Sequence, residues 1–269
     1  MPDLYANIND VAPDLQERLA GVLEERAADA RQKDMLHSYL SEIVFPMGAR
    51  VLEIGCGTGA VTRTLASWPG VAEAVGIDPC ATFIAKAKEL STGLSNIFFK
   101  VADGRSVSLD EASFDVVVVH TTLSHVPEPE VLLAQACRLL RPGGWLAVFD
   151  GDYATATVST GDADPLNACI DAFRGGFVHD PWLIRRLPAM IAVAGFSVQS
   201  TMSHGYVEGP EAGYLFTWIE RGAEVLVHNG RIGTDMAAAL KAEARRRSEG
   251  QEWFGHIAFA SVLARKAAA

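Results

Sequence analysis

The segment with the clearest capacity for chemistry is a strand-like run that ends in three closely spaced glycines. Val51-Leu-Glu-Ile leads into Gly55, Gly57 and Gly59, and a helix-compatible segment, 60–66, follows them. Glycine lets a backbone turn tightly and press against a ligand, and the first amides of the following helix would point at that ligand. The turn therefore predicts a nucleotide-type ligand, although the glycines alone fit more than one cofactor.

Three acids near this turn narrow the choice of ligand. Glu53 lies two residues before the first glycine, Asp78 follows Gly59 by 19 residues, and Asp103 ends the next predicted strand. Asp78 is placed to accept both hydroxyls of a ribose, with a helix cap as the alternative. Asp103 is placed to accept from an adenine amine, with a simple turn as the alternative. Glu53 would repel a pyrophosphate and attract an ammonium beside a sulfonium, so the acids favour a cationic cofactor over a dinucleotide.

Alternating strands and helices are expected to position these acids. The predicted strands are 50–55, 72–78, 97–102, 114–120, 145–149, 195–203 and 254–264, and the predicted helices are 58–67, 80–90, 129–140, 165–174, 181–194, 211–228 and 234–248. Residues 10–45 also show helical spacing, and the small, polar segment 151–161 is expected to be a loop. Continuous apolar strands between helices indicate a parallel sheet covered on both faces, whose ligands bind at the carboxyl ends of the strands.

Composition excludes several classes of partner. The 269 residues carry 23 Lys and Arg against 33 Asp and Glu, a net charge of −10, which predicts no binding to nucleic acid. The basic cluster Arg245-Arg246-Arg247 lies among acids and is interpreted as the solvated face of a helix. No leader pattern and no run of 18 apolar residues are found. We therefore expect a cytoplasmic protein without membrane insertion. The cysteines lack the spacing of a metal site, so no metal is predicted.

Five motifs follow one another at compatible spacings within residues 45–150. They are Val51-Leu-Glu-Ile-Gly-Cys-Gly-Thr-Gly59, Gly76-Ile-Asp-Pro79, Ala102-Asp-Gly104, Ser113-Phe-Asp-Val-Val117 and Leu140-Arg-Pro-Gly-Gly144. In this order they resemble the motifs of class I S-adenosylmethionine-dependent methyltransferases, and are most similar to the small-molecule branch that includes the ubiquinone and menaquinone methyltransferases. The resemblance implies an α/β fold with a doubly wound, mostly parallel seven-stranded sheet whose last strand is antiparallel.

The resemblance also implies S-adenosylmethionine as cofactor and a set of residues that bind it. These are Glu53, Gly55, Cys56, Gly57, Gly59, Asp78, Pro79, Asp103, Gly104, His120 and Thr121. The glycine turn would line the methionine part with Glu53 ordering the turn, and Asp78 would hold the ribose. Asp103 and Gly104 would meet the adenine, and the backbone of His120 would lie near the amino group of the methionine.

Three regions are expected along the chain. Residues 1–46 would form an N-terminal helical cap, 47–150 the cofactor-binding core, and 151–269 the acceptor-side loops, a helical lid and the last two strands of the same sheet. The lid is the helical insertion before the last strand, because about 45 residues there exceed what a connection needs. Helices of the cap would close over the cofactor, although Tyr5, Arg26 and Gln32 receive no assigned place.

Methyl transfer is an in-line displacement from a sulfonium, and a general base is needed only when the acceptor loses a proton. The candidates for a catalytic base are His120, His125, Asp152 and Tyr153. His125 resembles a histidine turn common in this branch and is therefore also interpreted as structural. Loop capping is the alternative for the last two residues.

The sequence therefore predicts methyl transfer to a small-molecule acceptor, with an apolar or aromatic body because aromatic residues gather late in the chain. A cofactor-binding subunit or sensor without turnover is the alternative, since no base is unambiguous. An NAD-dependent oxidoreductase is the third hypothesis. The pattern predicts neither the methylated atom nor the oligomeric state.

Overall fold

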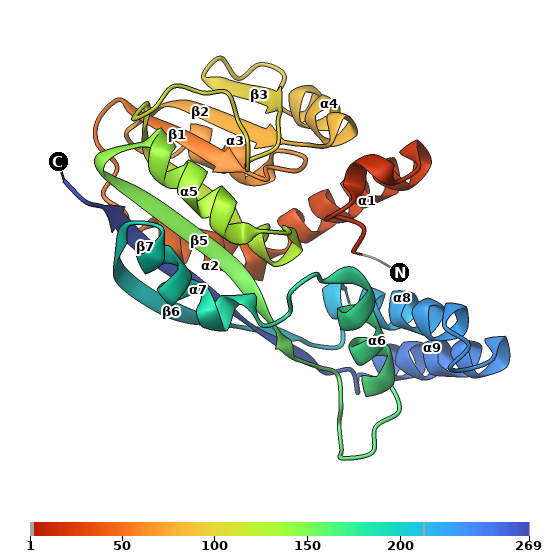
Figure 1. The fold of residues 1–269 in the computed structure, drawn as a ribbon. Helices are drawn as coiled ribbons and strands as arrows, with labels where there is room; N and C mark the ends of the chain where they lie inside the picture. The colour runs from red at the N-terminus through yellow and green to blue at the C-terminus, as the bar shows by residue number, and fades with distance from the viewer. Residues whose placement is uncertain (1–2, 212, 269) are drawn as a thin grey trace.

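A single mixed sheet of seven strands runs through the molecule in the computed structural model, which describes residues 3–211 and 213–268 (Figure 1). The strands are β1 (Ala49–Ile54), β2 (Val71–Asp78), β3 (Ile97–Val101), β4 (Phe114–His120), β5 (Leu140–Thr157), β6 (Phe196–Glu208) and β7 (Gly255–Lys266). Their order is β3-β2-β1-β4-β5-β7-β6, and β7 is antiparallel to both of its neighbours. The predicted fold class is confirmed.

Helices cover both faces of this sheet and extend beyond one end of it (Figure 1). They are α1 (Pro13–Ala28), α2 (Ala30–Leu40), α3 (Ala60–Ala66), α4 (Ala81–Leu90), α5 (Pro129–Leu139), α6 (Asn167–Phe177), α7 (Leu183–Val193), α8 (Tyr214–His228) and α9 (Thr234–Glu249), with short 3-10 turns at Ile8–Asp10 and Leu123–His125. Helices α6, α8 and α9 pack on one another past the far ends of β5 and β7. Within the described ranges, no helix is long and apolar enough to cross a membrane.

The central strands are apolar because both of their faces are covered. In β4, Val116, Val117, Val118 and Val119 are all fully buried, and they alternate between two hydrophobic clusters on the opposite faces of the sheet. Strand β1 lies between β2 and β4, so the strand order reverses beside it. Such a reversal opens a crevice at the carboxyl ends of the strands, which is where ligands of open α/β sheets bind.

Two stretches differ from their predicted structure. The helical segment 10–45 is broken at Asp29, whose side chain accepts from the amides of Arg31 and Gln32 (2.7 and 3.1 Å) and caps α2. The predicted loop 151–161 is wrong for its first part, because β5 continues to Thr157 along its antiparallel partner β7. That pairing depends on a strand about 100 residues away, so the small, polar local sequence does not reveal it.

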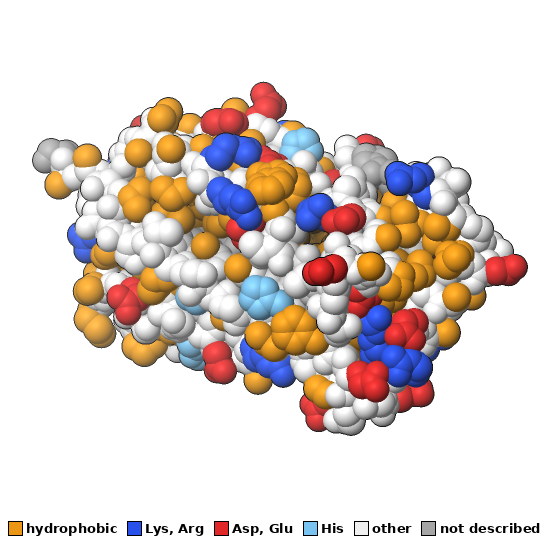
Figure 2. All heavy atoms as spheres, turned by 90° about the horizontal axis from the view of Figure 1, so that it is seen from below, with side chains coloured by type: hydrophobic (Ala, Val, Ile, Leu, Met, Phe, Trp, Pro, Cys, Tyr) orange, Lys and Arg blue, Asp and Glu red, His pale blue; other side chains and the backbone are white. Residues whose placement is uncertain are grey.

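The face shown in Figure 2 carries interspersed acidic, basic and hydrophobic side chains. Among the residues drawn in colour, this view contains no broad area of a single charge. The described residues of this face therefore offer no basic patch that would attract a phosphate backbone, in line with the net charge of −10.

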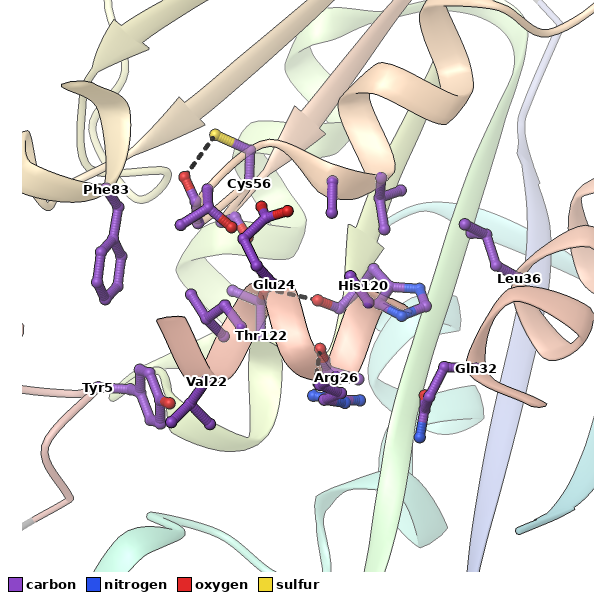
Figure 3. A pocket seen from close by; sticks show the side chains of 18 of the residues that line it. Tyr5, Val22, Glu24, Arg26, Gln32, Leu36, Cys56, Phe83, His120 and Thr122 are labelled. Atoms are coloured by element: carbon purple, nitrogen blue, oxygen red, sulfur yellow. Dashed lines mark hydrogen bonds between the residues drawn. The ribbon is translucent and has the colours of Figure 1, made fainter. Parts of the chain in front are cut away.

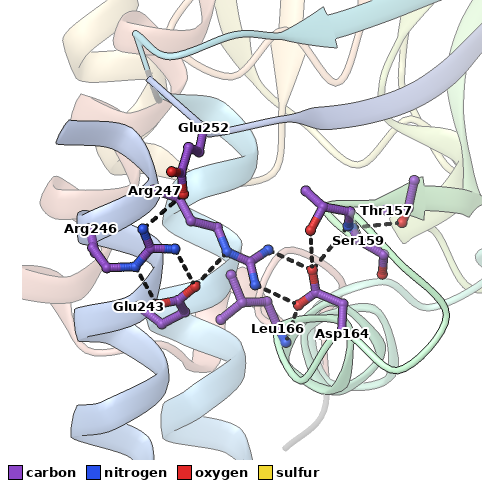
Figure 4. A network of polar contacts seen from close by, with 9 residues as sticks. Thr157, Ser159, Asp164, Leu166, Glu243, Arg246, Arg247 and Glu252 are labelled. Carbon is purple, nitrogen blue, oxygen red and sulfur yellow. Dashed lines mark hydrogen bonds and ion pairs between the residues drawn. The ribbon is translucent and has the colours of Figure 1, made fainter. Parts of the chain in front are cut away.

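One arginine of the predicted solvated cluster is buried, which corrects that interpretation (Figure 4). Arg245 and Arg246 are exposed and pair with surface acids, as expected. The side chain of Arg247 is only 10% exposed and donates two hydrogen bonds to Asp164, whose side chain is 2% exposed. This pair ties α9 to the loop before α6. Burial raises the pKa of Asp164, but the Arg247 hydrogen bonds outweigh it and hold the pKa at about 2.

We predict that Asp164→Ala destabilises the protein by about 2 kcal/mol, because the buried Arg247 then keeps only the more exposed Glu243 as its partner. Urea unfolding at pH 7 measures the change, and Glu220→Ala, which removes an exposed partner of Arg245, serves as the control with little effect. Since the folded pKa of Asp164 lies below its ordinary value, the stabilisation is present above about pH 4 and is lost as the pH falls towards 2. Equal unfolding midpoints for the two variants would contradict this assignment.

Candidate active site

A large cavity opens at the carboxyl ends of β1, β2 and β4, where the crevice was expected. Its volume is about 1070 Å³, at the upper end of the range for small-molecule sites. The walls come from the glycine turn, the strand ends, the N-terminal segment with α1 and α2, and the facing sides of α6 and α8. Figure 3 shows Cys56 of the glycine turn with Arg26 and Gln32, which enter the cavity from α1 and α2. A space of this size can hold two small ligands.

The glycine turn has the left-handed backbone that its sequence predicts. Gly55, Gly57 and Gly59 have φ angles of 76°, 51° and 80°, which few other residues adopt without strain. The turn is fixed to β2, because the amides of Gly55 and Cys56 both donate to the carbonyl of Ile77 (2.8 and 2.9 Å). A Cβ at Gly55 would clash with the side chain of Thr122, so the close approach itself requires glycine.

Asp78 joins this turn to the start of the next helix. Its carboxylate accepts from the amides of Gly57 and Cys80, each at 2.9 Å, and it is 7% exposed at the cavity wall beside Pro79. Burial raises the pKa of Asp78 to about 6, against the opposing effect of the two amides. Asp78 therefore binds the amide at the start of α4 and also faces the cavity. Its contact with a ribose stays a prediction.

Glu53 is buried behind the turn and is held by one hydroxyl. Thr62 of α3 donates to its carboxylate, and only 2% of the residue is exposed. Burial raises the pKa of Glu53 to about 8, in spite of the Thr62 hydrogen bond. Glu53 was expected to carry a negative charge, whereas in the free cavity its carboxyl group is mostly protonated near pH 7. A cation that enters the cavity would favour the ionised form.

Asp103 and Gly104 are not among the residues that line the cavity. The Asp103 carboxylate forms a two-pronged pair with the guanidinium of Arg105, at 2.7 and 3.1 Å, and this pairing lowers its pKa. Gly104 has a packing role, because a Cβ there would clash with Ile54. The adenine contact predicted for these two residues remains a prediction.

His120 faces the cavity from the end of β4, in a stack of aromatic rings. Its ring lies 4.6 Å from that of Phe149 at an angle of 11°, and its Nδ1 is 2.9 Å from the hydroxyl of Tyr39. Burial, and then the nearby charge of Arg26, lower the pKa of His120 to about 3. It is therefore neutral and a weak base at neutral pH. Thr121 also lines the cavity, and its hydroxyl accepts from Arg26.

His125 has a carboxylate partner that the sequence did not reveal. The oxygen Oδ2 of Asp3 lies 2.7 Å from His125 Nδ1 and also accepts from the amide of His179 at 2.8 Å. On its other side, His125 Nε2 lies 3.5 Å from the hydroxyl of Tyr153. Both His125 and Tyr153 line the cavity. No local signal could have found Asp3, because 122 residues separate it from His125.

Asp152 turns away from this group. It pairs with Arg185 of α7 at 2.9 Å and is not among the cavity-lining residues, so the geometry lends no support to its predicted catalytic role. The neighbouring Asp150 is fully buried and accepts from the amide and hydroxyl of Ser124 (3.0 and 2.8 Å). It fixes the short 3-10 turn that carries His125. In the described part of the chain, no group of three His, Cys, Asp or Glu residues could hold a metal ion.

The cavity also gathers residues that received no place from the sequence. Tyr5, Arg26 and Gln32 all line it, as does an aromatic cluster of α8, Tyr214 and Trp218. Trp218 of that cluster stacks between Tyr153 and Phe173, with ring centroids 5.9 and 4.2 Å away. One side of the cavity is therefore polar and glycine-lined, and the other is aromatic.

Comparison with known proteins agrees with this arrangement. Residues 52–148 match the model of a family described as a methyltransferase domain. Over 109 residues the chain is 32% identical to the ubiquinone biosynthesis O-methyltransferase of Xanthomonas axonopodis pv. citri. The aligned stretch covers 40% of this chain and 45% of that protein. The chain spans about half the length of the curated relatives it matches.

Solved structures share the fold at low identity. The (4+2)-cyclase SpnF superposes with a TM-score of 0.56 at 21% identity, over 88% of this chain and 82% of that one. Phosphoethanolamine N-methyltransferase 2 of Haemonchus contortus was solved in complex with phosphomonomethylethanolamine and S-adenosylhomocysteine. It superposes with a TM-score of 0.53 at 17% identity, over 87% of this chain and 52% of that one. At these identities the likeness shows the fold alone.

We predict that Glu53→Gln removes a pH dependence from the stability of the free protein. Because the folded pKa of Glu53 lies above its ordinary value, its contribution is complete below about pH 4.5 and is lost as the pH rises to about 8. Relative to the variant, the wild type should lose on the order of 3 kcal/mol between these limits. Urea unfolding from pH 5 to 9 measures the difference, with the exposed Glu252→Gln as control. Parallel curves for wild type and Glu53→Gln would contradict the prediction.

Proposed function

We propose that this chain, which belongs to the class I S-adenosylmethionine-dependent methyltransferases through its domain at residues 52–148, transfers a methyl group to a small organic acceptor. The observation that carries the proposal is the Asp78 carboxylate, bound to the glycine turn and facing a cavity with room for a second ligand. S-adenosylmethionine is the cofactor of this family. The identity of the acceptor, and the action of the whole chain on it, are part of the proposal.

The two sides of the cavity suit the two substrates. The methionine part of the cofactor would lie along Gly55, Cys56, Gly57 and Gly59, with its ribose at Asp78, and Glu53 would be ionised by the entering cation. The acceptor would lie against Trp218 and its neighbours. Catalysis then consists largely of holding the acceptor in line with the sulfonium and keeping water out.

His125 is the better candidate for a general base. The Asp3 carboxylate can orient its ring and stabilise the imidazolium that forms when it takes a proton. His120 lacks such a partner, and burial holds its pKa at about 3, so it would take up a proton poorly. We therefore propose that His120 shapes the cavity, that Asp3 is a positioning residue, and that Tyr153 borders the acceptor.

The regions proposed for these tasks keep the predicted boundaries. We propose that residues 1–46 cap the cavity, that 47–150 form the cofactor-binding core, and that 151–269 supply the acceptor side; described residues from each region line the cavity, which supports this division. A fold neighbour that is a cyclase shows that this fold also hosts other chemistry. Cofactor binding without transfer to any acceptor would therefore favour the alternative, a cofactor-binding subunit or sensor.

We predict that the wild type binds S-adenosylhomocysteine in a calorimetric titration and that Asp78→Asn weakens this binding at least about tenfold. The amide replaces one acceptor oxygen with a donor, so either the Gly57 or the Cys80 amide loses its acceptor, and the charge-assisted hydrogen bonds to the ribose hydroxyls are lost. Asp110→Asn, on the exposed surface, is the matched control. Absence of binding by the wild type would overturn the proposed function, and an unchanged affinity in Asp78→Asn would overturn the role of Asp78.

We predict that Asp3→Asn lowers kcat about 10- to 100-fold while the KM for S-adenosylmethionine changes less than threefold, because the base loses its orienting charge. Transfer of a labelled methyl group to a panel of small acceptors supplies the assay. Asp3→Glu should restore part of the rate, His125→Ala should match the defect, and the exposed Asp10→Asn should have no effect. A change confined to protein stability would show that the pair is only structural.

A further inference from the structure

Two arginines line the cavity without an acidic partner. Arg26 of α1 and Arg221 of α8 form no ion pair with any carboxylate in residues 3–211 and 213–268. The neighbouring surface of α8 and α9 behaves differently, since Lys241 pairs with Glu224 and Arg245 with Glu220. Arg26 and Arg221 are therefore unpaired guanidinium groups that line the cavity, where a bound ligand could neutralise them.

Polar atoms beside Arg26 lack hydrogen-bond partners. Its Nη1 donates to the Thr121 hydroxyl at 3.2 Å, but its Nη2 is buried and has no acceptor among the described residues. Gln32 is 6% exposed, and both its amide nitrogen and its amide oxygen are buried without a partner. Buried polar groups are rarely left unpaired, because each then keeps its desolvation cost. The Arg26 guanidinium and the Gln32 amide thus present two unpaired donors to one cavity, which indicates that a hydrogen-bond acceptor of a ligand belongs there.

Three tyrosines surround the same space. The Cζ of Arg26 lies 5.2 Å from the ring centre of Tyr214. Tyr5 lines the cavity together with Arg26 and Arg221, and burial raises the pKa of its hydroxyl. Burial also raises the pKa of Tyr153. These hydroxyls therefore stay protonated and can donate hydrogen bonds to an anion.

The position of Arg26 indicates that its guanidinium contacts the methyl acceptor rather than the cofactor. Its guanidinium lies over Phe259 of β7 and Tyr214 of α8, which come from the acceptor side of the chain. The cation beside the glycine turn is Arg63, which already pairs with Glu24 and donates to the carbonyl of Thr58. The two sides of the cavity thus differ in their free positive charge.

We propose, on the basis of the methyl transfer proposed above, that the acceptor is a small acid with an apolar or aromatic body, and that its anionic group lies between Arg26 and Arg221. A guanidinium pair suits a planar carboxylate or a phosphate, with the tyrosine hydroxyls as further donors. The body of the acid packs on Trp218 and Phe173. This anchor would turn the rest of the acceptor towards the sulfonium.

The test compares three probes that share one ring and differ in charge, namely benzoate, phenyl phosphate and neutral benzamide. Each is titrated by calorimetry into the full chain saturated with S-adenosylhomocysteine. We expect at least one anion to bind ten or more times as tightly as benzamide, and the better anion identifies the group. Equal binding of all three probes, or binding by neither anion, overturns the proposal. Failure of the wild type to bind S-adenosylhomocysteine is a separate result, which overturns the proposed function itself.

Arg26→Met and Arg221→Met each remove one charge and keep most of the side-chain length. Each should lower the affinity for the preferred anion at least tenfold and leave that for S-adenosylhomocysteine within threefold. Arg245→Met, on the exposed face, should change neither affinity. Loss of S-adenosylhomocysteine binding with retained anion preference would assign the arginines to the cofactor and overturn the proposal. Circular dichroism checks the fold, and Arg221→Met decides alone if Arg26→Met does not fold.

Discussion

The two hydrogen bonds that Asp78 accepts are the interaction on which the site depends. They join the end of β2 to the Gly57 amide in the turn after β1 and to the Cys80 amide at the start of α4. A parallel sheet places these strand ends side by side, and the left-handed glycines bring the backbone within reach. One carboxylate therefore fixes the floor of the cavity before any ligand binds, at the cost of a raised pKa.

The roof of the cavity is built from segments that are distant in sequence. Asp3 near the N-terminus reaches His125, Arg26 reaches Thr121, and Tyr206 of β6 donates to Asp29 between α1 and α2. These contacts bind the N-terminal helices to both halves of the sheet. A neutral histidine in an aromatic stack and a second histidine paired with an acid then lie in one cavity.

Predictions made from the sequence succeeded where the signal was local. The glycine turn and the apolar parallel strands depend on residues within about 30 positions of one another, so their spacing was informative. The extension of β5 to Thr157 and the burial of Arg247 were missed, because each depends on a partner from a distant segment. Asp152 was predicted to lie at the cavity for the same reason, since the sequence does not show that Arg185 draws it away.

The sequence by itself determined the sheet and the glycine turn, since backbone conformation and hydrophobic periodicity are written in neighbouring residues. Only the tertiary structure decided which charges are paired and which are free. It gave His125 a carboxylate, placed Arg105 on Asp103, and left Arg26 without an acidic partner in the part of the chain that is described. The physical reason is that burial and ion pairing are properties of packed surfaces, to which residues far apart in the chain contribute together.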